Sequence, residues 1–389
     1  MKIALDVRKI NDFGIGTYIR NLIKHLPSVD QETEYFLLCY RQDEELVRSL
    51  NPHFTPVRVK APNYSVREHI SIPAALRRLR VDLFHTPHYV LPLLTPCRSV
   101  VTIHDVIHLL FPQYLPSRMA SHYARYMIRR ALEKAELVLT VSDSSKRDLL
   151  TFFEVSPDKI VVIPNGLDSA MTAGLSVEEL AQVKERLQIF GRTVLFVGNI
   201  KPHKNVERLI AAFAKVREDP EFSDLTLIVV GDDISKYPSL RRTVERHKVR
   251  RNVRFFGFVP EPTLVALYKI ADVFAFPSLY EGFGLPPLEA MANGTPVVTS
   301  NISSLPEVVG NAALTVDPYN IDQIAKAIRE ILTDPTLRNR LIADGYERAK
   351  QFSWEGSAAQ VHQAYRQALG ISGTPSAEAQ TTHASRSNS

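Results

Sequence analysis

Short apolar runs alternate with segments of helical periodicity along most of the chain. In the first half these runs predict buried strands at residues 2–7, 34–40, 57–60, 82–85, 98–103, 137–141 and 160–163. Strands that are apolar throughout, rather than alternating, are typical of a parallel sheet covered by helices on both faces. Because helical or loop segments separate the runs, the first half of the chain is predicted to be α/β.

The second half repeats this rhythm without repeating the sequence. It predicts strands at 193–197, 225–230, 253–258, 272–276 and 296–299, and helices at 206–216, 264–270, 322–332 and 335–350. A chain of 389 residues exceeds the size at which one core stops growing, so two domains are expected. The expected divisions are a domain at 1–168, a connector at 169–190, a domain at 191–355, a final helix at 356–369 and a disordered polar tail at 370–389.

Residues 277–300 join a buried strand to a helix and then to the next strand. Gly282 and Gly284 stand in the loop, and the pair Pro286-Pro287 pre-sets the backbone for the start of a helix. The N-terminus of such a helix faces the carboxyl ends of parallel strands, where its unpaired N–H groups attract anions. This segment therefore predicts a binding site for a phosphate-bearing ligand.

Two glutamates, Glu281 and Glu289, belong to this loop and its helix. Each has an ordinary explanation, Glu281 as a surface loop residue and Glu289 as a carboxylate that complements the dipole in the first helical turn. Their combination is more specific. Two glutamates eight positions apart, with a Gly-Phe-Gly loop and a double proline between them, resemble the signature of the retaining GT-B glycosyltransferases of family 4, the glycosyl transferases group 1.

This resemblance covers about residues 1–369 and is closest to mannosyltransferases of the family. It implies an α/β fold of the GT-B type, with two Rossmann-like domains facing each other across a cleft and the last helix crossing back onto the first domain. The second domain would hold a nucleotide-sugar donor and the first domain the acceptor. The residues then implied for the donor are Gly282, Phe283, Gly284, Leu285 and Glu289, with Glu289 on the ribose and Glu281 in a catalytic position beside the sugar.

Lys204 is a further candidate for the donor site. It follows the strand at 193–197 and precedes a helix, where a compact positive charge can neutralise a diphosphate; otherwise it is a solvated lysine. Members of the family commonly carry an arginine a few residues before this lysine. This chain has Asn199 there, and we expect Asn199 to contact the donor while Lys201 makes up the missing charge.

Three residues in the first half complete the candidate site. Gly14 and Gly16 are predicted to form a turn between the first strand and a helix at 18–26, although a full dinucleotide fingerprint is missing. The resemblance implies that this turn abuts the donor diphosphate or the acceptor. His104 stands at the carboxyl end of the strand at 98–103. A lone histidine there is more often structural, whereas the resemblance implies a catalytic position on the acceptor side of the sugar. Four more histidines, at positions 69, 85, 88 and 108, lack tight metal-ligand spacing, so we expect no metal.

Composition and charge bear on the setting of the protein. The formal net charge is +5, and basic residues concentrate at Arg77, Arg78 and Arg80 and in the helical stretch 117–136. This surface is either a solvated helix face or a face that docks peripherally on anionic lipid and presents a lipid-linked acceptor. We find no membrane-spanning run or secretory signal and read Cys39 and Cys97 as reduced core residues, which predicts a cytoplasmic protein, with peripheral contact at the inner face of the membrane as an addition.

The expected function follows from the resemblance. It is retaining transfer of a hexose, with mannose favoured, from a nucleotide-diphosphate sugar to a saccharide or lipid-linked acceptor in surface polysaccharide or glycolipid assembly. GDP-mannose is the favoured donor, a UDP-sugar comes next, and neither a separate cofactor nor a nucleic-acid partner is expected. Two alternatives stay open: a non-catalytic nucleotide-sugar-binding protein, and a glycoside hydrolase or phosphorylase on the same fold.

Overall fold

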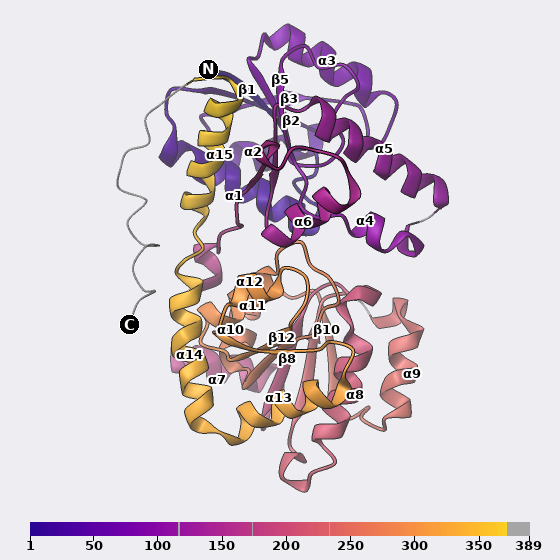
Figure 1. The fold of residues 1–389 in the computed structure, drawn as a ribbon. Helices are drawn as coiled ribbons and strands as arrows, with labels where there is room; N and C mark the ends of the chain where they lie inside the picture. Colours follow the sequence, from indigo (N-terminus) through magenta and orange to yellow (C-terminus); the bar gives the residue numbers. More distant parts are fainter. Residues whose placement is uncertain (116, 173, 233, 372–389) are drawn as a thin grey trace, which may run out of the picture.

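The computed structural model describes residues 1–115, 117–172, 174–232 and 234–371, and its strands form two parallel sheets (Figure 1). The N-terminal sheet has the order β3-β2-β1-β4-β5-β6-β7 and the C-terminal sheet the order β10-β9-β8-β11-β12-β13. The strands of the N-terminal sheet are β1 (Lys2–Asp6), β2 (Glu34–Cys39), β3 (Thr55–Arg58), β4 (Leu83–Thr86), β5 (Arg98–Thr102), β6 (Leu137–Thr140) and β7 (Ile160–Val162). Those of the C-terminal sheet are β8 (Thr193–Val197), β9 (Thr226–Val230), β10 (Val253–Gly257), β11 (Val273–Phe276), β12 (Val297–Ser300) and β13 (Ala313–Val316).

Helices cover both sheets, as the apolar character of the strands requires (Figure 1). Before the C-terminal sheet they are α1 (Phe13–Val29), α2 (Glu44–Leu50), α3 (Glu68–Leu79), α4 (Ile107–Leu110), α5 (Arg118–Lys134), α6 (Asp143–Phe152) and α7 (Val177–Arg186). The later helices are α8 (Val206–Val216), α9 (Pro238–Arg246), α10 (Glu261–Ile270), α11 (Leu285–Ala292), α12 (Leu305–Val309), α13 (Ile321–Thr333), α14 (Pro335–Ala349) and α15 (Trp354–Ala368).

The hydrophobic core divides according to the faces of the sheets. In β1, Ile3 and Leu5 pack into one cluster and Ala4 packs into another, because successive side chains of a strand point to opposite faces. Both faces of the N-terminal sheet are therefore buried, and this accounts for strands without polar alternation. A third cluster joins the C-terminal sheet to its helices.

The last helix, α15, returns to the N-terminal half and packs against α1 (Figure 1). Trp354 and Tyr365 are buried in the core on that side of the N-terminal sheet, and the Tyr365 hydroxyl lies 2.7 Å from Nδ1 of the buried His85. The chain passes between the halves twice, and the two passages meet where Leu167 N donates to Phe352 O at 3.1 Å. These contacts connect the two halves where the chain passes between them.

Each strand predicted from the sequence is present, with ends shifted by no more than two residues. The prediction missed β13, an edge strand whose residues are mostly half-exposed or exposed, so that its apolar pattern is weak. The helix expected from Tyr18 begins earlier, at Phe13, which places the two glycines of the predicted turn inside the first turns of α1. Of the tail predicted to be disordered, residues 372–389 lie outside the described residues.

The strand order fixes where a ligand enters each sheet. Connections leave β1 and β4 on opposite sides in the N-terminal sheet, and β8 and β11 do the same in the C-terminal sheet. Loops that diverge in this way leave a crevice at the carboxyl ends of the strands. In the described part of the chain, no helix is long and apolar enough to cross a membrane.

Candidate active site

Lys204 and Glu281 meet at the crevice of the C-terminal sheet. Lys204 ends a 3₁₀ turn after β8, and Glu281 opens the loop after β11. Lys204 Nζ donates to both carboxylate oxygens of Glu281, at 2.7 and 2.9 Å, and each side chain is 12% exposed. The ammonium group also lies 5.2 Å from the centre of the Phe276 ring, so both a carboxylate and an aromatic ring stabilise its charge.

The loop that carries Glu281 is held by two serines that follow β12. Ser303 accepts a hydrogen bond from Glu281 N at 2.9 Å and donates to Glu281 O at 2.7 Å, while Ser304 Oγ donates to Phe283 O at 2.6 Å. Gly284 has a φ of +110°, and a Cβ there would lie 2.8 Å from Leu305 Cδ2. Glycine is therefore required at the residue from which α11 begins. Neither serine was among the site residues predicted from the sequence.

The opposite wall of the site comes from the loop after β5. A Cβ on Gly282 would lie 2.6 Å from His104 O and 3.0 Å from Asp105 Cβ, so the two loops touch at backbone distance. Ser142, the N-cap of α6, donates to Gly282 O at 2.6 Å. The structure thus brings His104 and Glu281, predicted from distant parts of the sequence, to the two sides of Gly282.

His104 is in its neutral form at pH 7. Burial lowers the pKa of the imidazole to about 4. Its Nε2 lies 3.2 Å from Pro87 O, and since a carbonyl oxygen only accepts, Nε2 carries the proton and Nδ1 keeps a lone pair. The ring also meets the edge of Tyr18, with 4.9 Å between ring centroids. His104 is therefore equipped to accept a hydrogen bond rather than to donate a proton from Nδ1.

Asp105 lies beside His104 and was not among the site residues predicted from the sequence. Burial raises the pKa of its carboxyl; the N–H of Ile107, 2.9 Å from Oδ1, opposes this increase, and the negative charge of Glu281 adds to it. Its position at the end of a buried strand, next to a histidine already predicted for the site, could have identified it from the sequence. The site therefore holds two carboxylates, Asp105 and Glu281, around one lysine.

Glu289 lies in the second turn of α11 rather than in the first, which corrects the prediction. The helix begins at Leu285, one residue ahead of the double proline, so four residues precede Glu289. Tyr268 donates its hydroxyl proton to Glu289 Oε2 at 2.7 Å. Burial raises the pKa of Glu289 to about 7 against this hydrogen bond, and the charges of Glu261 and Asp168 raise it further. Interaction with the helix dipole in the first turn therefore does not explain why a glutamate stands at position 289.

The remaining residues predicted for the site differ in how exposed they are and in which atoms a ligand can reach. Gly14 is exposed, and no heavy atom lies within 4 Å of a Cβ built there, whereas a Cβ on Gly16 would lie 2.4 Å from Ile10 O. Asn199 is partly buried after β8, and its Oδ1 has no hydrogen-bond partner among the described residues. The Phe283 side chain is packed in the core of the C-terminal half, so only its backbone can face a ligand.

Further contacts fix the two halves together around this loop. Tyr280 donates to Asp148 Oδ2 at 2.8 Å and lies 3.3 Å from Val106 N, which donates to it. Glu307 Oε1 accepts from Ser144 N at 3.1 Å, at the N-terminus of α6. Within the described ranges, no three or more His, Cys, Asp or Glu side chains are grouped so that they could hold a metal ion.

Comparison with known proteins agrees with this arrangement. Residues 14–170 match the family described as Glycosyltransferase Family 4, and residues 182–348 match the one described as Glycosyl transferases group 1. Over 297 residues the chain is 35% identical to the O-antigen chain mannosyltransferase B of Escherichia coli, covering 75% of this chain and 76% of that protein. The chain belongs to glycosyltransferase family 4.

Two further relatives define how far this likeness extends. The family 4 chain is 29% identical over 267 residues to the serotype-specific mannosyltransferase WbdA of Escherichia coli, covering 68% of this chain but 32% of that protein. The Anabaena protein HepE, solved in complex with UDP-glucose, superimposes with a TM-score of 0.76 at 20% identity, over 94% of this chain and all of the other. The fold is therefore GT-B, and the protein is a glycosyltransferase.

Proposed function

We propose that this glycosyltransferase moves a hexose, with mannose favoured, from a nucleotide-diphosphate sugar to a saccharide or lipid-linked acceptor in surface polysaccharide or glycolipid assembly. One observation carries the proposal: at Gly282 the Lys204–Glu281 pair meets the loop of His104 and Asp105 from the other half. A donor held at Lys204 has its sugar at Glu281 and its outer face towards the N-terminal half. The acceptor then approaches from the side of the N-terminal sheet.

The donor diphosphate binds at Lys204 and at the N-terminus of α11. When the bond between the anomeric carbon and the diphosphate breaks, negative charge develops on the leaving oxygen, where a lysine and unpaired backbone N–H groups stabilise it. Lys204 must exchange one or both of its contacts with Glu281 for phosphate oxygens. We propose that this charge balance requires no divalent metal and no cofactor besides the donor.

Glu281, once released from Lys204, faces the sugar and stabilises positive charge at its anomeric carbon, as carboxylates do for oxocarbenium-like transition states. His104, with its lone pair on Nδ1, accepts a hydrogen bond from a sugar hydroxyl. The ionised carboxylate of Glu289 accepts hydrogen bonds from the ribose hydroxyls. As the acceptor oxygen bonds to the anomeric carbon, the acceptor hydroxyl gives its proton to the diphosphate oxygen whose bond to that carbon breaks. We propose retention of anomeric configuration, in keeping with the family.

Mannose and polysaccharide assembly are supported by the names of the Escherichia coli relatives, both mannosyltransferases and one of them of the O-antigen chain. GDP-mannose is accordingly the first donor to test. HepE was solved with UDP-glucose, so UDP-sugars are the second class. GDP-sugars and UDP-sugars differ in the nucleotide base, and none of the site residues described above distinguishes guanine from uracil.

Peripheral membrane contact is a further part of the proposal. On α5, Arg118, Arg125 and Arg129 are exposed on one side of the helix, together with Met119, which is 81% exposed, and Tyr126, which is 52% exposed. Basic residues beside exposed apolar side chains are typical of a helix that lies on anionic lipid. A lipid-linked acceptor would then be presented to the N-terminal half, with the protein working from the cytoplasmic side.

The test combines binding with product analysis. GDP-, UDP- and ADP-sugars are compared for their ability to raise the melting temperature, with and without Mg²⁺, since a ligand of the native state stabilises it by mass action. The expected result is a shift with one nucleotide class that Mg²⁺ does not change. Transfer from that donor to α-mannosides is then followed by NMR of the anomeric proton. No shift with any donor, or only hydrolysis in the presence of acceptor, would contradict the proposal.

A further inference from the structure

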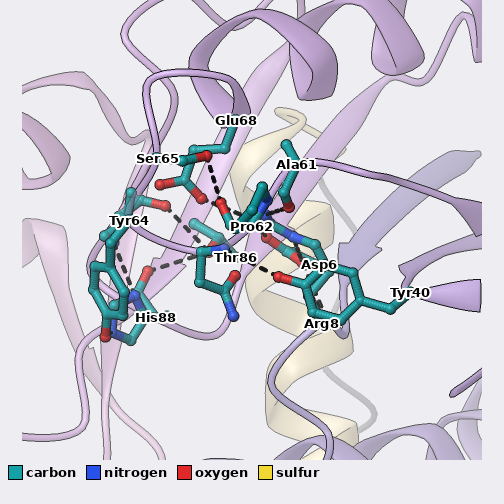
Figure 2. A network of polar contacts seen from close by, with 12 residues as sticks. Asp6, Arg8, Tyr40, Ala61, Pro62, Tyr64, Ser65, Glu68, Thr86 and His88 are labelled. Carbon is teal, nitrogen blue, oxygen red and sulfur yellow. Dashed lines mark hydrogen bonds and ion pairs between the residues drawn. The ribbon is translucent and has the colours of Figure 1, made fainter. Parts of the chain in front are cut away.

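A second group of polar side chains, most of them buried, lies at the crevice of the N-terminal sheet, between the ends of β1 and β4 (Figure 2). Asp6 ends β1 and Arg8 follows it, and Thr86 ends β4 and His88 follows it. Glu68, the first residue of α3, and Tyr64, in the loop before α3, close the group. These side chains line a narrow recess. Pro87, whose carbonyl holds His104, is part of its wall. The recess therefore adjoins the active site on the acceptor side.

Arg8 is fully neutralised inside this group. Its guanidinium donates to Asp6 Oδ2 at 2.6 Å, to Glu68 Oε2 at 3.0 Å and to Ala61 O at 3.0 Å, and its side chain is 3% exposed. Lys9 at the rim is paired with Asp12 at 2.7 Å. Two carboxylates thus surround the one buried cation, and the rim lysine has its own partner. An incoming phosphate would meet a neutral-to-negative wall.

One hydrogen-bond acceptor in this group has no donor among the described residues. Glu68 is 1% exposed, and its Oε1 has no hydrogen-bond partner among the described residues although its Oε2 is bound to Arg8. A buried carboxylate oxygen without a partner is costly, so it invites a donor from outside. Tyr64 offers a second polar group, since its hydroxyl lies 2.9 Å from His88 Nε2 at the same recess. Tyr64 is also 48% exposed, so it lies at the rim of the recess, where a ligand would make its first contact.

The recess is small. The free space between its walls accommodates about one water-sized group, which is enough for a hydroxyl but not for a phosphate. Size, charge and the unused carboxylate oxygen therefore favour the same occupant.

We propose that this recess receives one hydroxyl group of an uncharged acceptor sugar, which donates to Glu68 Oε1 while the ring rests at Tyr64. The proposal rests on the proposed function, because it treats the recess as part of the acceptor site of a glycosyltransferase. It adds a substrate class: acceptors that end in a neutral sugar are accepted, and acceptors with a phosphate at that position are excluded. Glu68 selects the acceptor and takes no part in the bond changes.

The test uses the full chain, the donor that gives the largest thermal stabilisation, and methyl α-mannoside with its four monodeoxy forms as acceptor probes. For one deoxy position other than the attacking hydroxyl, kcat/KM is expected to fall about 10- to 100-fold, the worth of a hydrogen bond to a charged group. In the Glu68→Gln variant this penalty is expected to disappear, while the KM for the donor and donor hydrolysis without acceptor stay unchanged. Mannose 6-phosphate is expected to be a poorer acceptor than mannose.

Controls separate selection from folding. Glu44→Gln makes the same chemical change at an arginine-paired glutamate of the same half, outside the recess, and should leave all deoxy penalties as they are. Tyr64→Phe keeps the ring and removes the hydroxyl, so it tests the recess even if the Glu68 variant is unstable, and the expected result is a higher KM for the acceptor alone.

Two results would overturn the proposal. One is a deoxy penalty that remains the same in the Glu68→Gln variant. The other is better transfer to the phosphorylated sugar than to the neutral one. In both cases donor binding and transfer persist, so the proposed function survives and only the role of the recess is lost. Loss of donor binding and hydrolysis in the unaltered protein would instead remove the proposed function and this inference together.

Discussion

The ammonium group of Lys204 bridges both carboxylate oxygens of Glu281, at 2.7 and 2.9 Å, across the two loops that define the crevice of the C-terminal sheet. The lysine that is proposed to bind the donor diphosphate is thus already paired before the donor arrives. Removing one member of a poorly exposed ion pair leaves the other charge uncompensated. The pair therefore links donor binding to the stability of this half of the protein.

The Lys204→Met variant is expected to lose on the order of 3 kcal/mol of unfolding free energy in urea, because Glu281 is only 12% exposed and loses its ion-pair partner. The control Lys215→Met breaks the exposed pair with Asp322 and should leave the unfolding free energy nearly unchanged. The double variant Lys204→Met/Glu281→Gln should regain most of the stability but none of the thermal shift with a nucleotide-sugar. A double variant that regains the shift would contradict the diphosphate role of Lys204.

Donor affinity is expected to rise with pH around neutrality. Burial raises the pKa of Glu289 to about 7, and only its ionised form accepts from two ribose hydroxyls, so affinity falls up to about tenfold per unit below that pH. The same shift affects folding: because the folded pKa exceeds the unfolded value near 4.5, the stabilisation is complete below pH 4.5 and is lost as pH rises through 7.

Calorimetric titration of the donor from pH 5.5 to 8.5 checks this dependence on Glu289. The Glu289→Gln variant should bind the donor weakly at every pH and should be more stable than the unaltered protein above pH 7. Glu185→Gln, on the exposed side of α7, is the matched control and should keep the original pH profile.

The His104→Ala variant is expected to lower kcat about 10- to 100-fold with little change in the donor KM, because Nδ1 of His104 is proposed to contact the sugar and not the nucleotide. Since the pKa of His104 is lowered to about 4, its removal should not shift any limb of the kcat profile between pH 6 and 8. His53→Ala changes an exposed histidine of the same half and serves as control. A lost ionisation near pH 6.5 in the His104 variant would argue for an acid–base role instead.

The Gly282→Ala variant is expected to separate the two loops that form the site. Its Cβ would come within 2.6 Å of His104 O, and that backbone carbonyl cannot rotate away as a side chain does. We expect at least a tenfold fall in kcat/KM, with the variant remaining folded. Gly174→Ala is the control, since a Cβ there meets no atom within 4 Å. Full activity of the Gly282 variant would show that the loops need not touch during turnover.

Binding to vesicles tests the exposed basic side of α5. Arg125→Glu/Arg129→Glu should lower co-sedimentation with vesicles that contain anionic phosphatidylglycerol, by about 1 kcal/mol for each charge removed. Arg250→Glu/Arg251→Glu changes the charge equally in the C-terminal half and should leave binding unchanged. Equal losses in the two variants would indicate attraction by net charge alone and not docking through α5.

The sequence alone determined the two parallel sheets and most of the donor loop. Strands such as β8 and β11 are apolar on both faces and end at a loop or proline, so local pattern was sufficient to place them. The family signature likewise rests on Glu281, Gly284 and Glu289, which are close together in the chain. The errors at the starts of α1 and α11 arose because caps and prolines allow more than one first residue.

The tertiary structure decided which distant groups neutralise one another. No local pattern indicates that Lys204 pairs with Glu281, that Gly282 touches the backbone of His104, or that Arg8 is enclosed by Asp6 and Glu68. The same holds for the pKa values of His104 and Glu289, which depend on burial by segments far away in the chain. Apolar patterning fixes which face of an element is buried, but charge pairing depends on strand order and on how the two halves meet, and short-range sequence carries neither.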